Sequence, residues 1–348
     1  MNAPTDTDAL QLSICIPTYN FGRFIGETLE SVLQQMQPNV EIVVLDSGST
    51  DETPRVVMQL KERYGCLRYE RAEERRGIDH DMARVVELAR GKYCWLFSAD
   101  DVMELGALTR VVAEIEQSKD VYVCMHSNET LTMQPIDPVH PVLDLSEDAS
   151  FQLADIGQQL RYFELAMTTE AFFSFISGLI VRKAAWDTLP LNEKFVGTCW
   201  AHVARLFEMI PSGLTVKFLA TVLVRRRGEN DSFATRGVVR RYALAIQGYQ
   251  NLAIHFWGGN SRQAFHIRRV LRNEFRLRMF LAAKALCLAH PAVEDRRLLD
   301  QLVRRTYSDG SPSCILKQLV YHLFPIPLYL PVRALYRRLR RQSERTRS

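Results

Sequence analysis

Residues 12–20 read LSICIPTYN, residues 41–51 read EIVVLDSGSTD, and residues 92–101 read KYCWLFSADD. In each stretch a short apolar run ends abruptly in polar residues. Such runs are typical of buried strands, and the polar residues are typical of the turns that follow them. Repeated strand–helix units of this kind form a mostly parallel sheet that is covered by helices. The three stretches therefore predict an α/β fold.

The sequence around these stretches extends the same pattern. Apolar residues at helical spacing follow the first strand up to Pro38, and another such stripe ends at Gly91. Prolines interrupt residues 129–170, which predicts little regular structure there. From residue 236 the pattern is helical to about residue 306. The other predicted elements are strands at 66–71, 121–125, 172–181 and 216–224, and helices at 53–63, 104–117 and 201–209.

Polar clusters follow three of the predicted strands. They are Pro17 to Asn20, Asp46 to Asp51, and Ser98 to Asp101. Ligands of open parallel sheets bind beyond the carboxyl ends of the strands, so we expect the clusters to converge in one crevice. A single Asp at a strand end is also a common turn former or helix cap. Adjacent acids repel unless a cation lies between them, and a hard divalent cation with oxygen ligands fits that position.

Two common nucleotide-binding motifs are absent. The sequence contains no GxGxxG dinucleotide fingerprint, and it contains no GxxxxGK[ST] phosphate loop. Hydride transfer and phosphate-loop chemistry therefore lose their main sequence signals. The pattern that remains is a crevice for a nucleoside diphosphate with a metal ion held by carboxylates.

The three stretches, taken in this order and spacing, resemble the family 2 glycosyltransferases, which have the GT-A fold. The resemblance covers about residues 10–230. Residues 77–101 (GIDHDMARVVELARGKYCWLFSADD) are similar to the abequosyltransferase-like enzymes of O-antigen assembly. The resemblance implies a GT-A-type nucleotide-diphospho-sugar transferase domain over residues 10–234. A mostly α-helical, basic region follows over residues 235–348.

The family pattern implies roles for the strand-end residues. A divalent metal ion, Mg²⁺ or Mn²⁺, would be held by Asp100 and Asp101, with Asp100 matching the metal-binding carboxylate of the family and Asp101 beside it. The first acid of the family's DxD motif is replaced by Ser98. Because a hydroxyl is a weak, uncharged ligand, fewer carboxylates and more waters would hold the ion. The residues expected to frame the nucleotide and the donor are Pro17, Thr18, Tyr19, Asn20, Asp46, Ser47, Ser98 and Ala99, with Asp46 on the base.

The general base is the second departure from the family pattern. The family has a Glu-Asp pair near the acceptor, and residues 185–215 contain none. His202 lies in the corresponding stretch, and an imidazole that titrates near neutral pH can remove a hydroxyl proton. It can equally be a packed histidine or a phosphate ligand. Asp79 or Asp81 is the next candidate base. Asp79, Asp81 and Arg84 are candidate donor contacts, and alternatively Asp79 or Asp81 caps the helix that follows Gly77.

An arginine-rich loop, RRRGENDS at residues 225–232, follows the last predicted strand. In the family this loop folds over the diphosphate, and Arg227 is the residue we expect to neutralise the leaving group. A solvated basic loop is the alternative. The resemblance thus implies an inverting glycosyltransferase that moves a sugar from a nucleotide-diphosphate donor to a hydroxyl of a glycan acceptor.

Two other function classes compete with this one. A nucleotidyltransferase also uses a parallel sheet and Mg²⁺, but its glycine-rich first loop is missing because the first strand ends in PTYN. A nucleic-acid-binding protein is suggested by the basic C-terminal part. The acidic front and the absence of a recognition motif argue against it, so we expect no nucleic-acid partner.

Charge is distributed unevenly along the 348 residues. Residues 235–348 contain 22 Lys and Arg against 6 Asp and Glu, a net charge of +16, whereas residues 1–234 carry −12. The 7 cysteines are odd in number and form no CxxC pair, which favours a reducing compartment. No signal peptide or apolar run long enough to span a membrane is visible. We therefore expect a cytoplasmic protein.

The end of the sequence predicts attachment to a membrane surface over residues 318–341. A Pro-interrupted apolar segment precedes five arginines that recur at helical spacing, Arg333, Arg337, Arg338, Arg340 and Arg341. Such a segment suits an anionic cytoplasmic leaflet, where an acceptor carried on a polyprenyl diphosphate would be found. The alternatives are a solvated tail or pairing with the acidic front of a neighbouring subunit.

Overall fold

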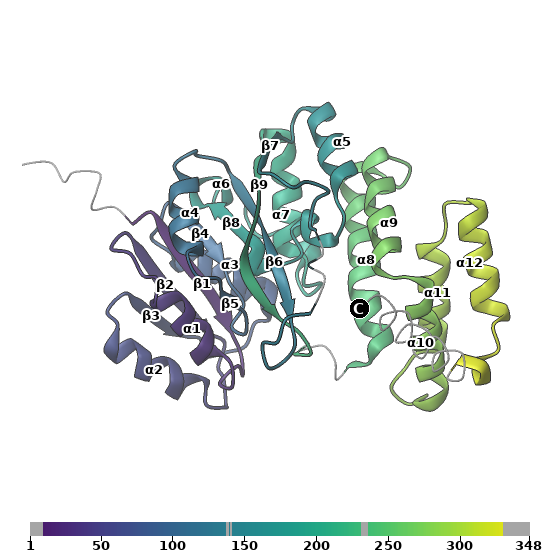
Figure 1. Ribbon diagram of the computed structural model, residues 1–348, viewed down its shortest axis with the longest axis horizontal. Coiled ribbons are helices and arrows are strands. Elements are labelled where there is room, and N and C mark those ends of the chain that lie inside the picture. Colours follow the sequence, from purple (N-terminus) through teal and green to yellow (C-terminus); the bar gives the residue numbers. More distant parts are fainter. Residues whose placement is uncertain (1–9, 137–138, 140, 231–235, 330–348) are drawn as a thin grey trace, which may run out of the picture. The chain divides into compact units, whose positions relative to one another are not determined.

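The computed structural model describes all residues except 1–9, 137–138, 140, 231–235 and 330–348. The chain divides into two compact units, Met1–Asn230 and Asp231–Ser348 (Figure 1). The first unit contains a mixed sheet with helices, and the second is helical. Each unit is described by itself below.

The sheet of the first unit has the strand order β3-β2-β1-β4-β8-β6-β9-β5, with β7 paired to β9. Strands β1 to β4 are mutually parallel where they pair, as predicted. The strands are β1 (Leu12–Thr18), β2 (Val40–Asp46), β3 (Leu67–Arg71), β4 (Tyr93–Leu96), β5 (Val102–Met103), β6 (Val121–Glu129), β7 (Ala149–Gln152), β8 (Leu179–Arg182) and β9 (Thr215–Arg227).

Strand register brings the polar clusters to one edge of the sheet. Thr18 of β1 lies directly beside Asp46 of β2 in the parallel ladder. On the other side of β1, Cys15 pairs with Leu96 at the end of β4, so the residues after β4 emerge at the same edge. This placement follows from parallel pairing of buried strands, and it agrees with the sequence prediction that the three clusters lie together.

Helices cover the sheet with apolar stripes. Leu29 and Val32 of α1 are fully buried, and burial of such a side chain contributes about 1.5–3 kcal/mol. The predicted helices at 53–63 and 201–209 match α2 and α7. The helices of this unit are α1 (Ile25–Leu33), α2 (Thr53–Arg63), α3 (Ile78–Leu88), α4 (Ala107–Ile115), α5 (Ile156–Leu165), α6 (Lys183–Trp186) and α7 (Ala201–Met209).

The strand predicted at residues 172–181 is wrong over most of its length. Two 3₁₀ helices, Thr169–Phe172 and Ile176–Gly178, occupy the segment, and β8 begins only at Leu179. Phe173 has φ 67°, which breaks any extended run. The hydrophobicity of the segment reflects burial of Phe172 and Phe173 in the core. Strand β8 is antiparallel to β4 and β6, so the sheet is mixed on this side.

The second unit consists of α8 (Val238–Trp257), α9 (Arg262–Glu274), α10 (Leu277–Ala289), α11 (Arg296–Thr306), α12 (Pro312–Leu323) and the 3₁₀ helix Ile326–Leu328. Helix α8 packs on α9 and α11, and α10 packs on α11 and α12. The sequence predicts helices only to about residue 306, so α12 is an addition. Within the described ranges, no helix has the length and hydropathy needed to cross a membrane.

Candidate active site

The ends of β1 and β2 are joined by hydrogen bonds between their loops. The Asn20 amide donates to Ser49 Oγ at 2.8 Å, and the Thr50 amide donates to Asn20 Oδ1 at 2.8 Å. Asn20 has φ 60°, a left-handed conformation that asparagine tolerates. The buried Thr18 hydroxyl has no hydrogen-bond partner in the described part of the chain. The loops are therefore fixed relative to each other, and one polar group beside them is left available.

Asp46 is fully buried at the end of β2. Its Oδ1 accepts from the Ser49 amide at 2.7 Å, and its Oδ2 accepts from the Tyr69 hydroxyl at 2.6 Å. Burial raises the pKa of Tyr69, and the hydrogen bond to Asp46 raises it further. Ser47 is also fully buried, and its amide donates to the Thr18 carbonyl at 2.9 Å. Asp46 thus organises the loop, and its contact with a nucleotide base stays a prediction that this burial does not favour.

Asp100 and Asp101 lie after β4 in unlike environments. Asp100 accepts from the Ser98 hydroxyl and, at 2.9 Å, from Asn230 Nδ2. Asp101 is 2% exposed, and its two oxygens accept from Ser177 Oγ at 2.6 Å and from the Arg227 amide at 2.9 Å. Burial, together with the charge of Asp100, raises the pKa of Asp101 to about 7. The cluster therefore gains stability from a nearby cation.

The oxygen atoms of this acidic cluster fit a divalent cation that takes most of its ligands from phosphate and water rather than from the protein. Within the described residues, no three His, Cys, Asp or Glu side chains gather into a metal-binding group. Asp100 accepts hydrogen bonds from two side chains, Ser98 and Asn230, which a metal ion can replace. Asp101 accepts from the Ser177 side chain and from the Arg227 backbone amide. A hard cation such as Mg²⁺ or Mn²⁺ accepts a single protein carboxylate when phosphate and water oxygens complete its ligands.

Arg227 is held inside the protein. Its Nε donates to the Asp100 carbonyl at 2.8 Å, one terminal nitrogen pairs with Glu27 at 2.6 Å, and the guanidinium lies 5.0 Å from the centroid of the Phe24 ring. The side chain is 3% exposed. With its donors engaged in this way, Arg227 fixes the loop after β9 against the loop after β4. Its predicted contact with the leaving group stays a prediction, and this burial counts against it.

The neighbouring Arg226 is more accessible, with a side chain that is 39% exposed. It pairs with Glu170 at 3.0 Å and lies 5.2 Å from the centroid of the Phe175 ring. Burial alone would raise the pKa of Glu170, but the His126 hydrogen bond and the Arg226 charge outweigh it and hold the pKa at about 2. The charge of Arg226 also lowers the pKa of Asp101. An ionised Glu170 therefore keeps a cation beside the acidic cluster.

Asp79, in the first turn of α3, binds the segment that precedes α7. Its carboxylate accepts from the amides of Gly197 at 2.9 Å, Cys199 at 3.0 Å and Ala201 at 3.0 Å. Cys199 has φ 68°, a conformation that only firm tertiary contacts maintain for such a residue. Asp79 therefore works as a cap for α7 rather than for its own helix. Its contact with a donor stays a prediction, which these three hydrogen bonds do not favour.

His202 is buried in the first turn of α7. Its Nε2 lies 3.0 Å from the Phe173 carbonyl, and only 3% of the residue is exposed. Burial lowers the pKa of His202 to about 4, although the nearby Asp79 charge opposes the shift. The imidazole is therefore neutral at pH 7. The role of general base stays a prediction for His202, and the burial of its ring counts against it.

The lowered pKa of His202 predicts a pH-dependent stability. Between pH 6.5 and pH 4 the His202 side chain binds a proton in the unfolded chain but not in the folded protein. The contribution of His202 to the unfolding free energy is therefore complete at neutral pH and is lost as the pH falls through this range. The shift corresponds to at most roughly 3 kcal/mol. Urea unfolding of the wild type and of His202→Gln at pH 4, 5, 6 and 7 measures the difference. Equal pH slopes for the two proteins would show that His202 is solvated and free to act as a base.

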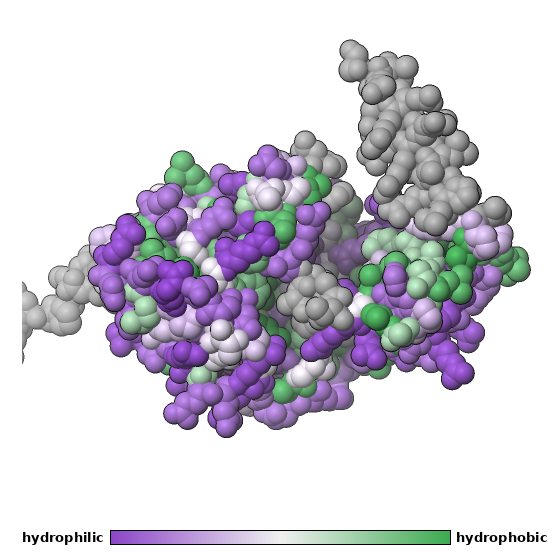
Figure 2. Space-filling model, turned by 90° about the horizontal axis from the view of Figure 1, so that it is seen from below, coloured by the Kyte–Doolittle hydropathy of each residue, from purple (hydrophilic) through white to green (hydrophobic). Residues whose placement is uncertain are grey.

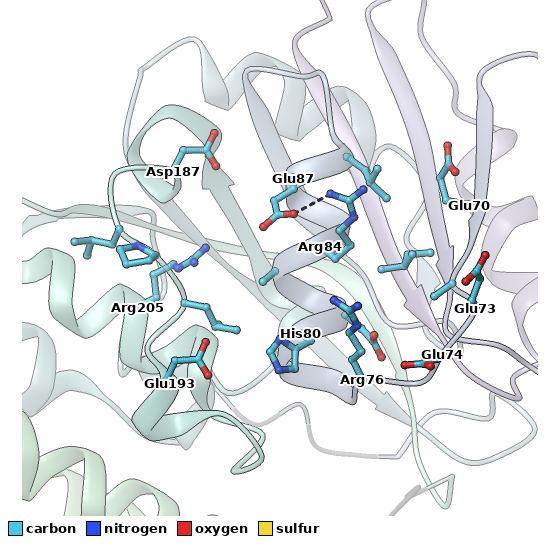
Figure 3. A pocket seen from close by; sticks show the side chains of 18 of the residues that line it. Glu70, Glu73, Glu74, Arg76, His80, Arg84, Glu87, Asp187, Glu193 and Arg205 are labelled. Carbon is cyan, nitrogen blue, oxygen red and sulfur yellow. Dashed lines mark hydrogen bonds and ion pairs between the residues drawn. The ribbon is translucent and has the colours of Figure 1, made fainter.

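A cavity of about 1060 Å³ runs across the outer face of α3 (Figure 3). His80 and Arg84 of α3 and Arg205 of α7 lie around it in Figure 3, and Asp81 of α3 is also among its lining residues. Arg84 pairs with Glu87 at 3.0 Å. Burial raises the pKa of Asp81, and the charge of Arg75 opposes the rise. The structure thus places Asp81 and Arg84 at one cavity, which Asp46, Asp100 and Arg227 do not line.

Several residues of the site have no sequence signal. Ser177 joins Asp101 to the loop after β4, because its hydroxyl donates to Asp101 and accepts from the Ser98 amide at 2.9 Å. Arg75 stacks 4.0 Å from the centroid of the Tyr19 ring. Both contacts link residues far apart in the sequence. Arg226 and Asn230 belong to the RRRGENDS loop, which the sequence predicts as part of the site. The sequence does not show which residues of this loop lie near Asp100 and Asp101.

Comparison with known proteins finds a family match for part of the chain. Residues 13–168 match the model of "Glycosyl transferase family 2". The chain is 28% identical to abequosyltransferase RfbV of Salmonella typhimurium over 253 residues, which are 72% of this chain and 76% of that protein.

Two solved structures share the fold. S. aureus TarS 1-349 in complex with UDP-GlcNAc has a TM-score of 0.56 and 15% identity, covering 94% of this chain and 92% of that one. Mannosyltransferase PcManGT from Pyrobaculum calidifontis, in complex with GDP-Man and Mn2+, has a TM-score of 0.53 and 20% identity, covering 96% and 85%. The chain therefore carries a family 2 glycosyltransferase domain in a GT-A fold, and it is a glycosyltransferase.

Proposed function

We propose that the protein is an inverting transferase that uses a nucleoside-diphosphate sugar and a hydroxyl of a glycan acceptor. The observation that carries this proposal is the meeting of the three strand-end clusters at one edge, with Asp100 held there by Ser98 and Asn230. The abequosyltransferase relative supports a role in surface polysaccharide synthesis of the O-antigen type. A deoxyhexose or hexose is the sugar class that this likeness favours.

The donor would lie along the ends of β1, β2 and β4. The loop from Pro17 to Asn20 frames the nucleotide, with the Tyr19 ring backed by Arg75. Ser47 and the buried Thr18 hydroxyl, which has no hydrogen-bond partner within the described residues, lie at the same strand ends. Asp100 would hold the divalent ion, whose charge stabilises the diphosphate when it is bound. Solved neighbours carry UDP-GlcNAc or GDP-Man with Mn2+, which supports this donor class.

Two residues remain candidates for the general base. Asp81 and His202 are both buried, at 9% and 3% exposed, but only Asp81, whose pKa burial raises, lines the cavity across α3. A base must reach the acceptor hydroxyl within hydrogen-bond distance, so the cavity favours Asp81. Attack by the deprotonated hydroxyl on the face opposite the diphosphate inverts the anomeric centre. The chain contributes alignment and electrostatic stabilisation to this step.

The arginine loop provides a prediction that separates two neighbouring residues. Arg226→Ala should lower kcat by about 10²-fold and lower the unfolding free energy by about 1–2 kcal/mol, because it removes a half-buried cation that pairs with Glu170 and whose charge acts on Asp101. Arg227→Ala should lower the unfolding free energy by about 2–4 kcal/mol, because buried hydrogen bonds of a charged group are lost. Steady-state kinetics and urea unfolding of both variants measure this. Full kcat in a folded Arg226→Ala protein would return the leaving-group role to Arg227.

The acceptor and its place in the cell follow from the charge of the second unit. We propose residues 10–234 as the transferase domain and residues 235–348 as a region that holds the enzyme at the cytoplasmic face of the cell membrane. There it would meet an acceptor on a polyprenyl diphosphate. Of the segment 318–341 predicted to bind the anionic surface, residues 330–341, with all five arginines, lie outside the described residues.

Incubation of the full-length protein with a panel of nucleotide sugars tests the transferase proposal. Release of nucleoside diphosphate should occur with a subset of donors, should rise with Mg²⁺ or Mn²⁺, and should increase when a lipid-linked glycan is added. Release of pyrophosphate from a nucleoside triphosphate would instead identify a nucleotidyltransferase. No release from any donor, with the protein folded, would contradict the proposal.

A further inference from the structure

The outward face of α12 is apolar. Exposed fractions are 50% for Ile315, 61% for Leu316, 51% for Leu319 and 77% for Leu323, and Pro312 is exposed beside them. At 100° per residue these positions fall within an arc of about 100°. Figure 2 shows hydrophobic side chains at the end of the second unit where Figure 1 places α12. A surface helix usually turns such a stripe toward the core, so the orientation of α12 is the reverse of the ordinary one.

The inward face explains why α12 cannot turn over. Tyr321 is fully buried, and its hydroxyl donates to Asp300 Oδ1 at 2.7 Å. Lys284 of α10 is also buried, and its Nζ donates to the carbonyls of Tyr321 at 2.6 Å and Phe324 at 3.2 Å. A buried lysine thus binds the carbonyl end of the helix, where a cation is favoured. The exposure of the leucines is therefore built into the packing of the unit.

Charge indicates which partner covers the stripe. Residues 330–348, which continue the chain shortly after α12, contain seven Arg and one Glu, and residues 235–348 carry a net charge of +16. A partner that is apolar at the stripe and also anionic therefore fits this part of the chain. A second copy of this chain would bring a second region with the same positive charge. A bilayer with anionic headgroups offers acyl chains and negative charge together.

We propose that α12 lies in the plane of an anionic membrane, with Ile315, Leu316, Leu319 and Leu323 among the acyl chains. This inference rests on the proposed function, because it names the surface on which the transferase would work. A helix of 12 residues is about 18 Å long, too short to cross a bilayer. The stripe supplies apolar contact, and the net positive charge of residues 235–348 supplies attraction to the headgroups.

Sedimentation of the full-length protein with vesicles tests the proposal. The vesicles are phosphatidylcholine alone and phosphatidylcholine with phosphatidylglycerol. Leu316→Gln/Leu319→Gln/Leu323→Gln should bind the anionic vesicles more than about tenfold more weakly than the wild type. The matched control is Leu105→Gln/Ile156→Gln, which changes residues of the first unit that are 84% and 61% exposed and should bind like the wild type. Equal binding by the triple variant would overturn the proposal.

Two further measurements distinguish membrane binding by α12 from a loss of transferase activity and from dimer formation. Nucleoside diphosphate release from a soluble donor should be the same in the triple variant and in the wild type, so a loss of vesicle binding with unchanged turnover supports the membrane role alone. Vesicle binding without turnover by any protein would contradict the proposed function and leave the role of α12 supported. Sedimentation velocity without lipid should show monomers; a dimer that the triple variant dissociates would overturn the proposal in favour of a second copy.

Discussion

Asp100→Asn should reduce kcat/KM by roughly 10³-fold while the protein remains folded. The substitution keeps the size of the side chain and an acceptor for Ser98, but it removes the negative charge at the edge where the three clusters meet. A divalent cation then loses the carboxylate that fits it. Nucleoside diphosphate release at saturating Mg²⁺ or Mn²⁺, with circular dichroism to confirm folding, gives the measurement.

Ser98→Ala is the matched comparison for this variant. It removes the hydroxyl that donates to Asp100 and leaves the carboxylate charge in place, so the loss should be no more than about tenfold. A folded Asp100→Asn protein that keeps more than a tenth of wild-type kcat/KM would remove Asp100 from the metal site. Equal losses in the two variants would assign the effect to the hydrogen bond between them.

Asp79→Ala should lower the unfolding free energy by about 3 kcal/mol, because three amides before α7 lose their shared acceptor. For a unit of this size the melting temperature should fall by about 6–12 °C. Turnover should fall as well, since the released segment includes the strained Cys199 and leads into α7. Differential scanning calorimetry and initial rates measure the two effects.

Two controls bracket the Asp79 result. Asp79→Asn keeps one acceptor oxygen, so about half of the lost stability should return. Glu87→Ala removes an acid from the exposed side of the same helix, where the side chain is 59% exposed, and should change stability by less than about 0.5 kcal/mol. A loss below about 1 kcal/mol in Asp79→Ala would mean that the three hydrogen bonds do not hold the segment.

The predictable parts of the fold are those that local pattern determines. Helices α2 and α7 were predicted with their bounds because each has apolar residues at helical spacing and a clear stop. The strand-end clusters were predicted to meet because parallel pairing requires it. The segment 172–181 was mispredicted because hydrophobic residues buried in 3₁₀ turns have the same composition as a strand.

The roles of single residues depended on contacts that the sequence does not show. The sequence predicts Asp46 as a nucleotide ligand, and it could not show that each of its oxygens accepts a hydrogen bond, from the Ser49 amide and from Tyr69. Asp79 looked like a cap for its own helix and instead binds amides more than a hundred residues away. Arg226 and Arg227 are adjacent in the sequence, but one is exposed and the other is buried. Tertiary packing decides each case.

The most direct test of the account is a crystal structure of the full-length protein with a nucleoside diphosphate and Mn²⁺, using the anomalous signal of manganese. The account predicts manganese beside the Asp100 carboxylate and the nucleotide against the Tyr19 loop at the ends of β1 and β2. It predicts that Asp100, and not the more deeply buried Asp101, contacts manganese, because Asp101 is also tied to the Arg227 backbone amide. A nucleotide bound elsewhere, for example only in the cavity across α3, or manganese away from Asp100, would contradict it.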